Sequence, residues 1–398
     1  MPEGAARPVV RLMPKVWERR EGAAPWIWAD QVVRDRRTRA LAPGTIVTVE
    51  DAGRVPVATA ALNLGSKIGL RLLGPAEMGP VDEAWFAGRL HTALALREAL
   101  YPAPVYRLVH AEADGLPGVV IDRFGEAAVV QPNAAWAERY EGALLAALVA
   151  VTGVETVVLN GVGRARGREG LAERREVLCG PLEGPVPVEM NGATYLADLM
   201  GGQKTGLFLD QRETQAFAQR LAPGRRVLDV FCHVGGFALA TLVAGAEGAV
   251  AVDASAPALA LAEGGARASG VAERFAARQG DAFAVMEEMA GAGERFGLVV
   301  SDPPAFAPSK EALEAGLRAY RKSARAAARL VAPDGFLIVC SCSHAADLAR
   351  FRAASLAGVA AARRTARILW TGGAGPDHPV HPALVESGYL KAIAMALD

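Results

Sequence analysis

Val227-Leu-Asp-Val-Phe-Cys-His-Val-Gly-Gly-Phe237 is the stretch that decides the fold of this 398-residue chain. A run of strand-type residues leads into a turn that contains Gly235 and Gly236, and an apolar helical segment follows. Glycines at such a turn let a ligand approach the backbone amides at a helix N-terminus. The stretch therefore predicts a strand, a ligand-binding turn and a helix.

The same alternation of strands and helices continues after Pro223-Gly224. Strands are expected at 226–230, 249–252, 275–279, 298–301 and 336–340, and helices at 237–245, 256–269, 283–289, 310–331 and 345–359. Strands that alternate with helices form parallel sheets with crossover connections. We therefore expect a doubly wound α/β domain, with ligands beyond the carboxyl ends of its strands.

Two smaller regions are expected ahead of this domain. Short alternating strands at 45–50, 55–60 and 68–73, separated by turns, predict a compact β-barrel. A helix at 82–100 and a strand–strand–helix–strand unit predict a central α+β module. The expected domains are 1–76, 77–185 and 186–398.

Composition limits the classes of function. Lys plus Arg equals Asp plus Glu, at 43 each, so a nucleic acid would need a local basic patch. The four cysteines form no Cys-x-x-Cys pair, which argues against a disulfide framework or a zinc site. No segment has the ~18 apolar residues of a membrane span. We expect a cytoplasmic protein with no metal and no membrane partner.

Two basic segments are candidates for phosphate contact. The first runs from Arg11 to Arg39 and encloses Trp26 and Trp28, and the second is an arginine-rich stretch at 161–176 that is expected to be an exposed loop. Basic residues beside aromatic ones bind phosphates and stack on bases. The alternative is that the tryptophans pack in the barrel core and the arginines are solvated.

Three acidic residues stand at the ends of expected strands. Asp253 follows Asp229 by 24 residues, and Asp281 ends the third strand. A carboxylate at the second position can accept both hydroxyls of a ribose. The Gly-x-Gly-x-x-Gly turn of dinucleotide sites is missing, so the pattern favours a nucleoside cofactor such as S-adenosylmethionine. A single such acid is often only a helix cap.

Asp302-Pro-Pro-Ala-Phe306 follows the fourth expected strand. Two prolines stiffen the turn, so the Asp302 side chain is expected to face a substrate held at the strand ends. Phe306 is then available to stack on a base. The alternative is a simple turn with a core phenylalanine.

Cys342 lies beyond the fifth expected strand, between the hydroxyls of Ser341 and Ser343. Cys340 is expected in the core, as free cysteines usually are. A thiolate over a base-binding cleft fits methylation at a pyrimidine carbon, since addition to C6 makes C5 nucleophilic. Such a thiol needs an electropositive environment to ionise. A buried structural thiol is the alternative.

Taken together, these residues resemble the RlmI-type family of S-adenosylmethionine-dependent ribosomal RNA methyltransferases, which modify C5 of a cytosine in large-subunit RNA. The resemblance covers nearly the whole chain and is carried by the motifs at 112–118, 202–212, 229–237, 302–306, 341–343 and 377–380. It implies an N-terminal PUA domain, a central module and a Rossmann-like class I methyltransferase domain. A homodimer and a ribosomal RNA partner are further expectations of the resemblance.

By that resemblance the site residues fall into three groups. Cys342 is the nucleophile and Asp302 acts with it. The residues expected at the cofactor are Phe208, Gln211, Arg212, Asp229, Phe231, Gly235, Gly236, Asp253, Asp281 and Asp302. Those expected at the RNA are Gln203, Lys204, Pro303, Pro304, Phe306, Ser341, Ser343 and His378.

Other functions stay open on the sequence. Asp-Pro-Pro loops also serve N-methyltransferases that act on exocyclic amines of adenine or guanine and need no cysteine. A non-catalytic RNA-binding assembly factor and, more remotely, a nicotinamide oxidoreductase are further alternatives. The base that removes the C5 proton is undecided between Asp302, His344 and His378, and Asp302 has the alternative role of holding the cytosine amino group and N3.

Overall fold

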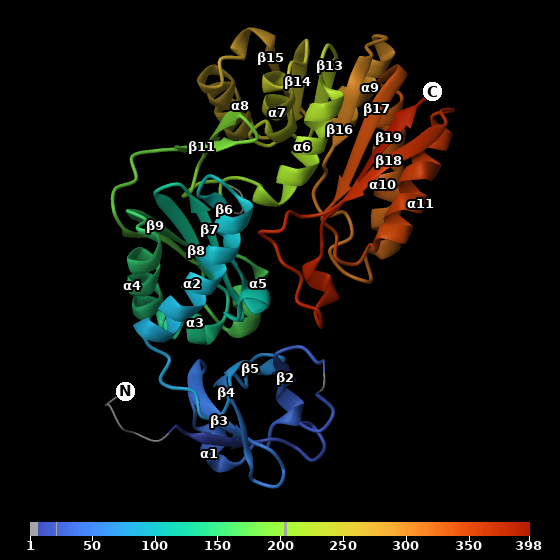
Figure 1. The fold of residues 1–398 in the computed structure, drawn as a ribbon. Coiled ribbons are helices and arrows are strands. Elements are labelled where there is room, and N and C mark those ends of the chain that lie inside the picture. Colours follow the sequence, from blue (N-terminus) through green and yellow to red (C-terminus); the bar gives the residue numbers. More distant parts are fainter. Residues whose placement is uncertain (1–6, 21, 203–204) are drawn as a thin grey trace. The chain divides into compact units, whose positions relative to one another are not determined.

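The computed structural model of the chain describes residues 7–20, 22–202 and 205–398. They form two compact units (Figure 1). The first unit is Met1–Glu183 with Pro379–Ser387, and the second is Gly184–His378 with Gly388–Asp398. Among the described residues, no helix has the length and apolar character of a membrane span.

The first unit begins with a five-stranded sheet in the order β1-β3-β4-β5-β2. Its strands are β1 (Val9–Arg11), β2 (Trp26–Trp28), β3 (Thr45–Glu50), β4 (Pro56–Leu62) and β5 (Ile68–Gly74), with a short helix α1 (Arg36–Arg39). The apolar side chains of alternate strand positions, such as Val47, Val49 and Leu70, are fully buried in one cluster. The three strands expected from alternation are therefore confirmed within two residues at each end.

The rest of the first unit is an α+β layer with strand order β10-β9-β8-β7-β6. Its elements are α2 (Glu83–Leu100), β6 (Val105–His110), β7 (Val119–Phe124), β8 (Ala127–Pro132), α3 (Ala135–Arg139), α4 (Glu141–Thr152), β9 (Thr156–Gly161), α5 (Arg164–Glu169) and β10 (Arg174–Cys179). One apolar core joins this layer to the first sheet, because Ile46 and Leu73 belong to the same cluster as Phe86 and Trp136. A domain boundary at 76/77 stays a proposal.

The arginine-rich stretch at 161–176 is not the exposed loop that its composition predicts. It contains helix α5 and the start of strand β10, and the Arg166 side chain is fully buried. The Arg166 guanidinium donates hydrogen bonds to the carbonyl oxygens of Pro132 and Ala172 and pairs with Glu138. Arg164 and Arg168 are exposed as predicted. The prediction was wrong for the loop and for Arg166, because a charged residue can be buried when its donors find acceptors.

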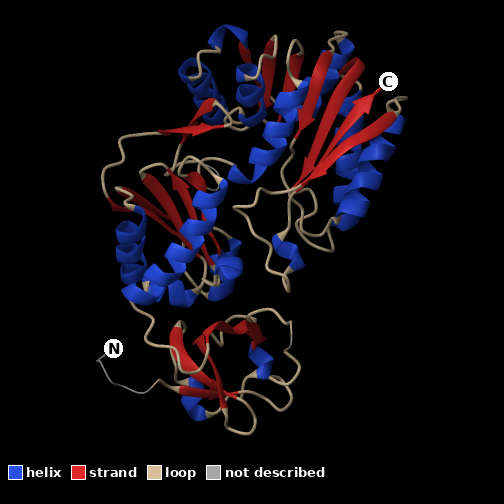
Figure 2. Cartoon of the chain, in the orientation of Figure 1, coloured by secondary structure: helices blue, strands red, loops and turns tan. Residues whose placement is uncertain are grey.

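The second unit opens with a hairpin, β11 (Val186–Met190) and β12 (Ala193–Ala197), and turns at Asn191-Gly192 as expected. Helix α6 (Arg212–Leu221) then leads into alternating strands and helices (Figure 2). These are β13 (Arg226–Val230), α7 (Gly236–Val243), β14 (Gly248–Asp253), α8 (Ala256–Ala268), β15 (Phe275–Gln279), α9 (Ala282–Gly291), β16 (Phe296–Ser301), α10 (Leu313–Ala328), β17 (Val331–Ser341) and α11 (Leu348–Ala361). The predicted doubly wound α/β fold is confirmed.

Two further strands complete the sheet of the second unit. β18 (Ala366–Gly372) and β19 (Lys391–Leu397) make antiparallel pairs, so the sheet order is β15-β14-β13-β16-β17-β19-β18. The strand–helix alternation did not predict them, since no crossover helix connects them. The order reverses between β13 and β16, and a crevice for ligands forms at such a reversal.

Candidate functional site

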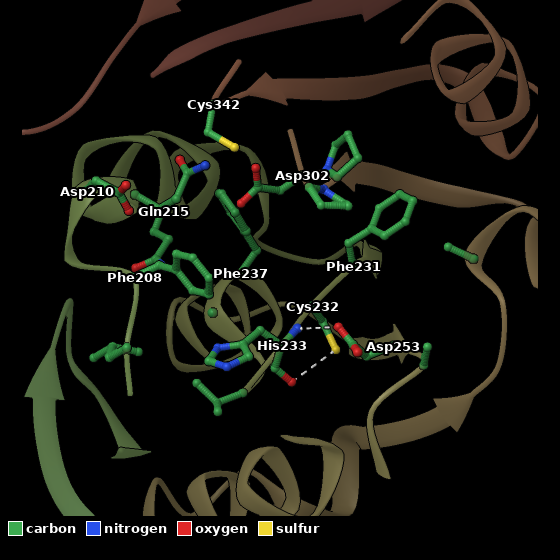
Figure 3. Close-up of a pocket in the computed structure, with 18 of the residues that line it drawn as sticks. Phe208, Asp210, Gln215, Phe231, Cys232, His233, Phe237, Asp253, Asp302 and Cys342 are labelled. Carbon is green, nitrogen blue, oxygen red and sulfur yellow. Dashed lines mark hydrogen bonds between the residues drawn. The ribbon is translucent and has the colours of Figure 1, made fainter. Parts of the chain in front are cut away.

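A cavity of about 330 Å³ lies in the second unit, beside the carboxyl ends of the parallel strands (Figure 3). This volume is at the lower end of the range of small-molecule sites. Its walls come from the segment before α6 and from the turns after β13, β14, β15, β16 and β17. The lining includes ten of the residues expected at the site: Phe208, Gln211, Phe231, Gly236, Asp253, Asp281, Asp302, Pro303, Pro304 and Cys342.

The turn after β13 has an unusual backbone. Phe231 and His233 adopt φ of 63° and 51°, and Gly235 adopts φ of 79°. The left-handed conformation costs about 1–2 kcal/mol for a residue with a side chain. At Gly235 a side chain would also come within 3.1 Å of the Ala262 Cβ. Strain of this kind persists where the surrounding structure enforces it, and it is common at ligand-binding turns.

Asp229 is fully buried beneath this turn and is not among the described residues that line the cavity. Its Oδ2 accepts hydrogen bonds from the backbone N–H groups of Phe237 and Ala238, at 3.1 and 2.9 Å. Burial, helped by the charge of Asp253 and opposed by the two backbone donors, raises the pKa of the Asp229 carboxyl to about 7. Asp229 therefore holds the first turn of α7 in place.

Asp253 and Asp281 both line the cavity, at the ends of neighbouring strands. The Asp253 carboxylate accepts backbone N–H groups from His233 at 2.8 Å and Ser255 at 2.9 Å. Each carboxylate oxygen keeps a further lone pair for a ligand hydroxyl. Asp281 is exposed and caps α9 through the N–H of Ala284. Asp281 therefore both caps a helix, which was the alternative left open by the sequence, and lines the cavity.

Asp302 and Cys342 follow the neighbouring parallel strands β16 and β17. Both side chains are half-buried and line the cavity. Figure 3 shows the sulfur of Cys342 and the carboxylate of Asp302 pointing into the same part of it. The two groups that the sequence singled out for chemistry are thus brought together by the sheet.

Ser341 and Ser343 do not face the cavity, although the sequence suggested substrate contacts for both. Both are fully buried, and the Tyr320 hydroxyl lies 2.8 Å from the Ser341 hydroxyl and 2.7 Å from that of Ser343. The Ser343 hydroxyl also accepts the backbone N–H of Ala307 at 2.9 Å. The expectation is corrected here: these hydroxyls tie the Cys342 turn to the loop that follows Asp302.

Phe306 is half-buried in an aromatic cluster and does not line the cavity. Its ring centroid lies 5.0 Å from Tyr320, 6.3 Å from Phe283 and 6.5 Å from Phe231. A ring with these neighbours supports the loop from behind, which favours the alternative of a core phenylalanine. Stacking of Phe306 on a base stays a prediction.

The candidate bases differ in their surroundings. His378 is buried with its Nδ1 2.9 Å from the Asp377 carboxylate, so it is not placed to contact RNA as expected. His344 is exposed and its ring centroid lies 5.5 Å from that of Tyr389. Asp302 is the candidate whose side chain lines the cavity.

The remaining expected residues lie beside the cavity or outside the described chain. Gly235 is buried at the N-cap of α7, and Arg212 is half-buried at the start of α6. Neither is among the described residues of the cavity wall. Gln203 and Lys204 were expected at the RNA and lie outside the described residues.

Several lining residues had not been assigned a role from the sequence. They include Asp210, Gln215, Cys232, His233 and Phe237. His233 and Phe237 belong to the glycine turn, so their place in the sequence next to Gly235 and Gly236 could have indicated that they line the cavity. Gln215 lies inside α6, where no pattern marks it. Among the described residues, no group of three or more His, Cys, Asp or Glu is arranged to hold a metal ion.

Comparison with known proteins gives matches over most of the chain. A family described as S-adenosylmethionine-dependent methyltransferase matches residues 148–359, and one described as a PUA-like domain matches residues 10–74. Ribosomal RNA large subunit methyltransferase I of Photobacterium profundum is 34% identical over 376 residues, which are 93% of this chain and 94% of the relative. The enzyme of the same description from Tolumonas auensis is 34% identical over 379 residues, with the same coverage.

A solved structure shares the fold at lower sequence identity. The S-adenosylmethionine-dependent methyltransferase from Streptococcus mutans superposes with a TM-score of 0.79 at 18% identity. The superposition covers 98% of this chain and 100% of that one.

Proposed function

This chain belongs to the RlmI-type S-adenosylmethionine-dependent methyltransferases of large-subunit ribosomal RNA, and we propose that it methylates C5 of a cytosine in that RNA. The expected PUA-like domain and the expected methyltransferase domain are confirmed by the family matches. The observation that carries the proposal is the meeting of Cys342 and Asp302 in one cavity.

The cavity residues fit S-adenosylmethionine. The Asp253 carboxylate has lone pairs that can accept the ribose hydroxyls of the cofactor. The Asp281 carboxylate lies in the cavity wall and is suited to contact the adenine of the cofactor. The rings of Phe208, Phe231 and Phe237 supply apolar walls, as nucleoside sites require. When bound, the cofactor supplies an electrophilic methyl group. Asp229, Gly235 and Arg212 serve it indirectly in this proposal, since they support the wall without lining it.

The proposed reaction uses Cys342 as a nucleophile. The electron pair of its thiolate forms a bond to C6 of the cytosine, and the π electrons of the C5=C6 double bond move toward C5, which becomes nucleophilic. C5 then takes the methyl group, and the electron pair of the broken S–CH3 bond would stay on the sulfur of the cofactor. A base removes the C5 proton, and the electron pair re-forms the double bond and releases the Cys342 thiolate. Asp302 is suited to hold the cytosine amino group and N3 or to remove that proton.

The test uses Cys342→Ala with Cys179→Ser as the matched cysteine control. Cys179 is a half-buried free cysteine of the first unit. Methylation of large-subunit RNA is expected to fall below detection in Cys342→Ala and to stay unchanged in Cys179→Ser. RNA that contains 5-fluorocytosine is expected to form a stable covalent complex with the parent chain and none with Cys342→Ala.

Two outcomes would favour the other functions. Full methylation by Cys342→Ala would indicate an N-methyltransferase, because the Asp302-Pro-Pro loop alone can serve an exocyclic amine. No binding of S-adenosylmethionine in a calorimetric titration would indicate an RNA-binding factor without catalysis. Bisulfite mapping of the RNA from cells with and without the gene identifies both the base and its position.

A further inference from the structure

Lys391 is a buried lysine that no step of the proposed reaction has used. It is the first residue of β19, and 8% of its surface is exposed. Lys391 pairs with Ser341 in the sheet, and its Nζ donates a hydrogen bond to the Ser343 carbonyl oxygen at 2.6 Å. Lys391 therefore contacts the residues on both sides of Cys342, Ser341 through its backbone and Ser343 through its ammonium.

The cavity that Cys342 faces has an acidic wall. Among the described residues that line the cavity, four are aspartates and none is lysine or arginine. The titratable groups on elements around Cys342 include Asp210 before α6, Asp229 on β13, Asp302 after β16, Tyr320 on α10, Cys340 on β17, His344 two residues after Cys342, Asp347 before α11, Tyr389 before β19 and Lys391 on β19. Lys391 is the cation in this set that donates a hydrogen bond to the backbone of the Cys342 turn.

In this acidic environment, the Cys342 thiol needs a nearby positive charge to ionise. A cysteine reacts as the thiolate, and nearby carboxylates oppose its ionisation. An ammonium within a few ångströms favours the thiolate, and the effect is larger in a site shielded from water. The Ser343 carbonyl accepts from only one of the three donors of the Lys391 ammonium, so further donors remain for other acceptors.

We propose that Lys391 is a positioning residue that keeps Cys342 ionised and holds its turn through the Ser343 carbonyl. The proposal rests on the function of Cys342 as the nucleophile. It explains why a lysine is buried at this point of the sheet, since a buried ammonium is costly unless an opposite charge and acceptors compensate it.

The electrostatics of Lys391 itself agree with this coupling. Burial lowers the pKa of the Lys391 ammonium, and the negative charge of Cys342, followed by that of Asp347, counteracts the effect. The influence is reciprocal, because a thiolate that stabilises the ammonium is stabilised by it to the same extent. The charged form of Lys391 is therefore more favourable beside the Cys342 thiolate than it would be for a buried lysine without such a partner.

The test measures the pH dependence of Cys342 alkylation by iodoacetamide, a neutral reagent, with peptide-resolved mass spectrometry. Lys391→Met removes the charge and the donor, Lys391→Gln removes the charge and keeps a donor for the Ser343 carbonyl, and Lys391→Arg keeps the charge. We expect the midpoint of the alkylation profile to rise by about one to two pH units in Lys391→Met and Lys391→Gln. That shift slows alkylation about 10- to 100-fold below the midpoint of the parent chain. Lys391→Arg is expected to retain most of the parent profile.

The controls separate a charge effect from a structural one. Lys67→Met removes an exposed lysine from the first unit and is expected to leave the profile unchanged. Calorimetric binding of S-adenosylmethionine reports whether each variant keeps a folded site. If Lys391→Met fails to fold, Lys391→Gln decides the matter. An unchanged midpoint in a folded Lys391→Gln overturns the proposal and leaves Lys391 as a structural anchor.

The assay also stands apart from the test of the proposed function. Alkylation of Cys342 needs no RNA and no methyl transfer, so its pH profile reports on Lys391 even if Cys342→Ala remains an active methyltransferase. If the alkylation midpoint shifts in the Lys391 variants as expected but Cys342→Ala still methylates RNA, the proposed role of Cys342 as the nucleophile is refuted. A missing Lys391 effect with an inactive Cys342→Ala would refute only the role of Lys391.

Discussion

Asp229 illustrates how one buried carboxylate supports the cofactor turn without lining the cavity. Its Oδ2 holds the backbone of Phe237 and Ala238, while Oδ1 has no hydrogen-bond partner among the described residues. Burial disfavours the charged form of this carboxyl, which is the main cause of its raised pKa. The residue therefore couples the stability of the turn to pH.

We predict a pH-dependent effect of Asp229→Asn on stability. The pKa of Asp229 rises from 3.8 to about 7 in the folded chain, so the folded state binds more protons than the unfolded state between these values. The stability of the parent chain thus falls as pH rises through this window, by on the order of 2–4 kcal/mol from this group. Asparagine keeps an acceptor and carries no charge. Thermal unfolding should show its advantage over the parent growing from pH 4 to 7.

The control for this prediction is Asp82→Asn. Asp82 is exposed and caps α2 through the Trp85 N–H at 2.9 Å. Its difference from the parent chain is not expected to grow over the same window. A constant difference for Asp229→Asn as well would contradict the raised pKa.

Asp302 gives a second prediction, which concerns catalysis. Asp302→Asn keeps the size of the side chain and removes its charge, so contacts to the cytosine or the transfer of its C5 proton are weakened. We expect kcat to fall about 10²- to 10⁴-fold. The dissociation constant of S-adenosylmethionine, measured by calorimetry, is expected to change much less. A loss of cofactor affinity as large as the loss of kcat would assign Asp302 to the cofactor instead.

Helix α10 connects the two loops that carry the chemistry. Tyr320, on its buried face and 2% exposed, has its hydroxyl near those of both Ser341 and Ser343. Its ring packs on Phe306 and Phe351. Tyr320 thus contacts both the Asp302 loop and the Cys342 turn, in addition to the hydrogen bond from Ala307 to Ser343 that joins them.

We predict that Tyr320→Phe destabilises the chain and slows the reaction. The variant removes one hydrogen-bond partner from each of two buried serine hydroxyls, at a cost of about 1–3 kcal/mol. Since the Cys342 turn then loses its hydrogen bonds to Tyr320 and keeps the one from the Ala307 N–H of the Asp302 loop, kcat is expected to fall while the affinity for S-adenosylmethionine is kept. Thermal unfolding and steady-state kinetics measure the two effects. Tyr140→Phe, which removes a half-buried hydroxyl from the first unit, is the control.

Contact with RNA must come from local patches, because the chain has no net charge. In the first unit, a hollow of about 260 Å³ is lined by Lys15, Arg19, Arg20, Trp26 and Trp28. Trp28 is 46% exposed, whereas Ile27 between the two tryptophans is fully buried in the core. The sequence left open whether the tryptophans pack in the barrel or remain available, and for Trp28 the structure favours availability.

We predict that Lys15→Ala with Arg19→Ala weakens binding of large-subunit RNA. If both side chains contact phosphates, the slope of log affinity against log salt should fall by about 1.4–1.8. Filter binding at several salt concentrations measures it. The comparison variant is Arg164→Ala with Arg168→Ala, which removes two exposed arginines of α5. A larger change in the α5 variant would move the phosphate contact to that helix. The expected homodimer stays a prediction for sedimentation analysis.

Local sequence pattern was sufficient for the elements and for the strand ends that carry chemistry. The period of apolar residues predicted β13 and β15 at their observed bounds, and the positions of Asp253, Asp302 and Cys342 after strands placed them at one edge of the sheet. This works because alternation and turn residues are short-range properties that each segment expresses by itself. The motif resemblance then named the family correctly.

Tertiary structure alone decided which side chains at that edge reach the cavity. Ser341 and Ser343 turn inward because Tyr320, on a helix about twenty residues earlier, satisfies their hydroxyls. Arg166 is buried because Pro132 and Glu138, about thirty residues earlier in the chain, accept its hydrogen bonds. Lys391 contacts the Cys342 turn from the antiparallel strand β19, which the strand–helix alternation did not predict because no crossover helix precedes it. These outcomes depend on hydrogen-bond partners far apart in the chain, and no local pattern contains that information.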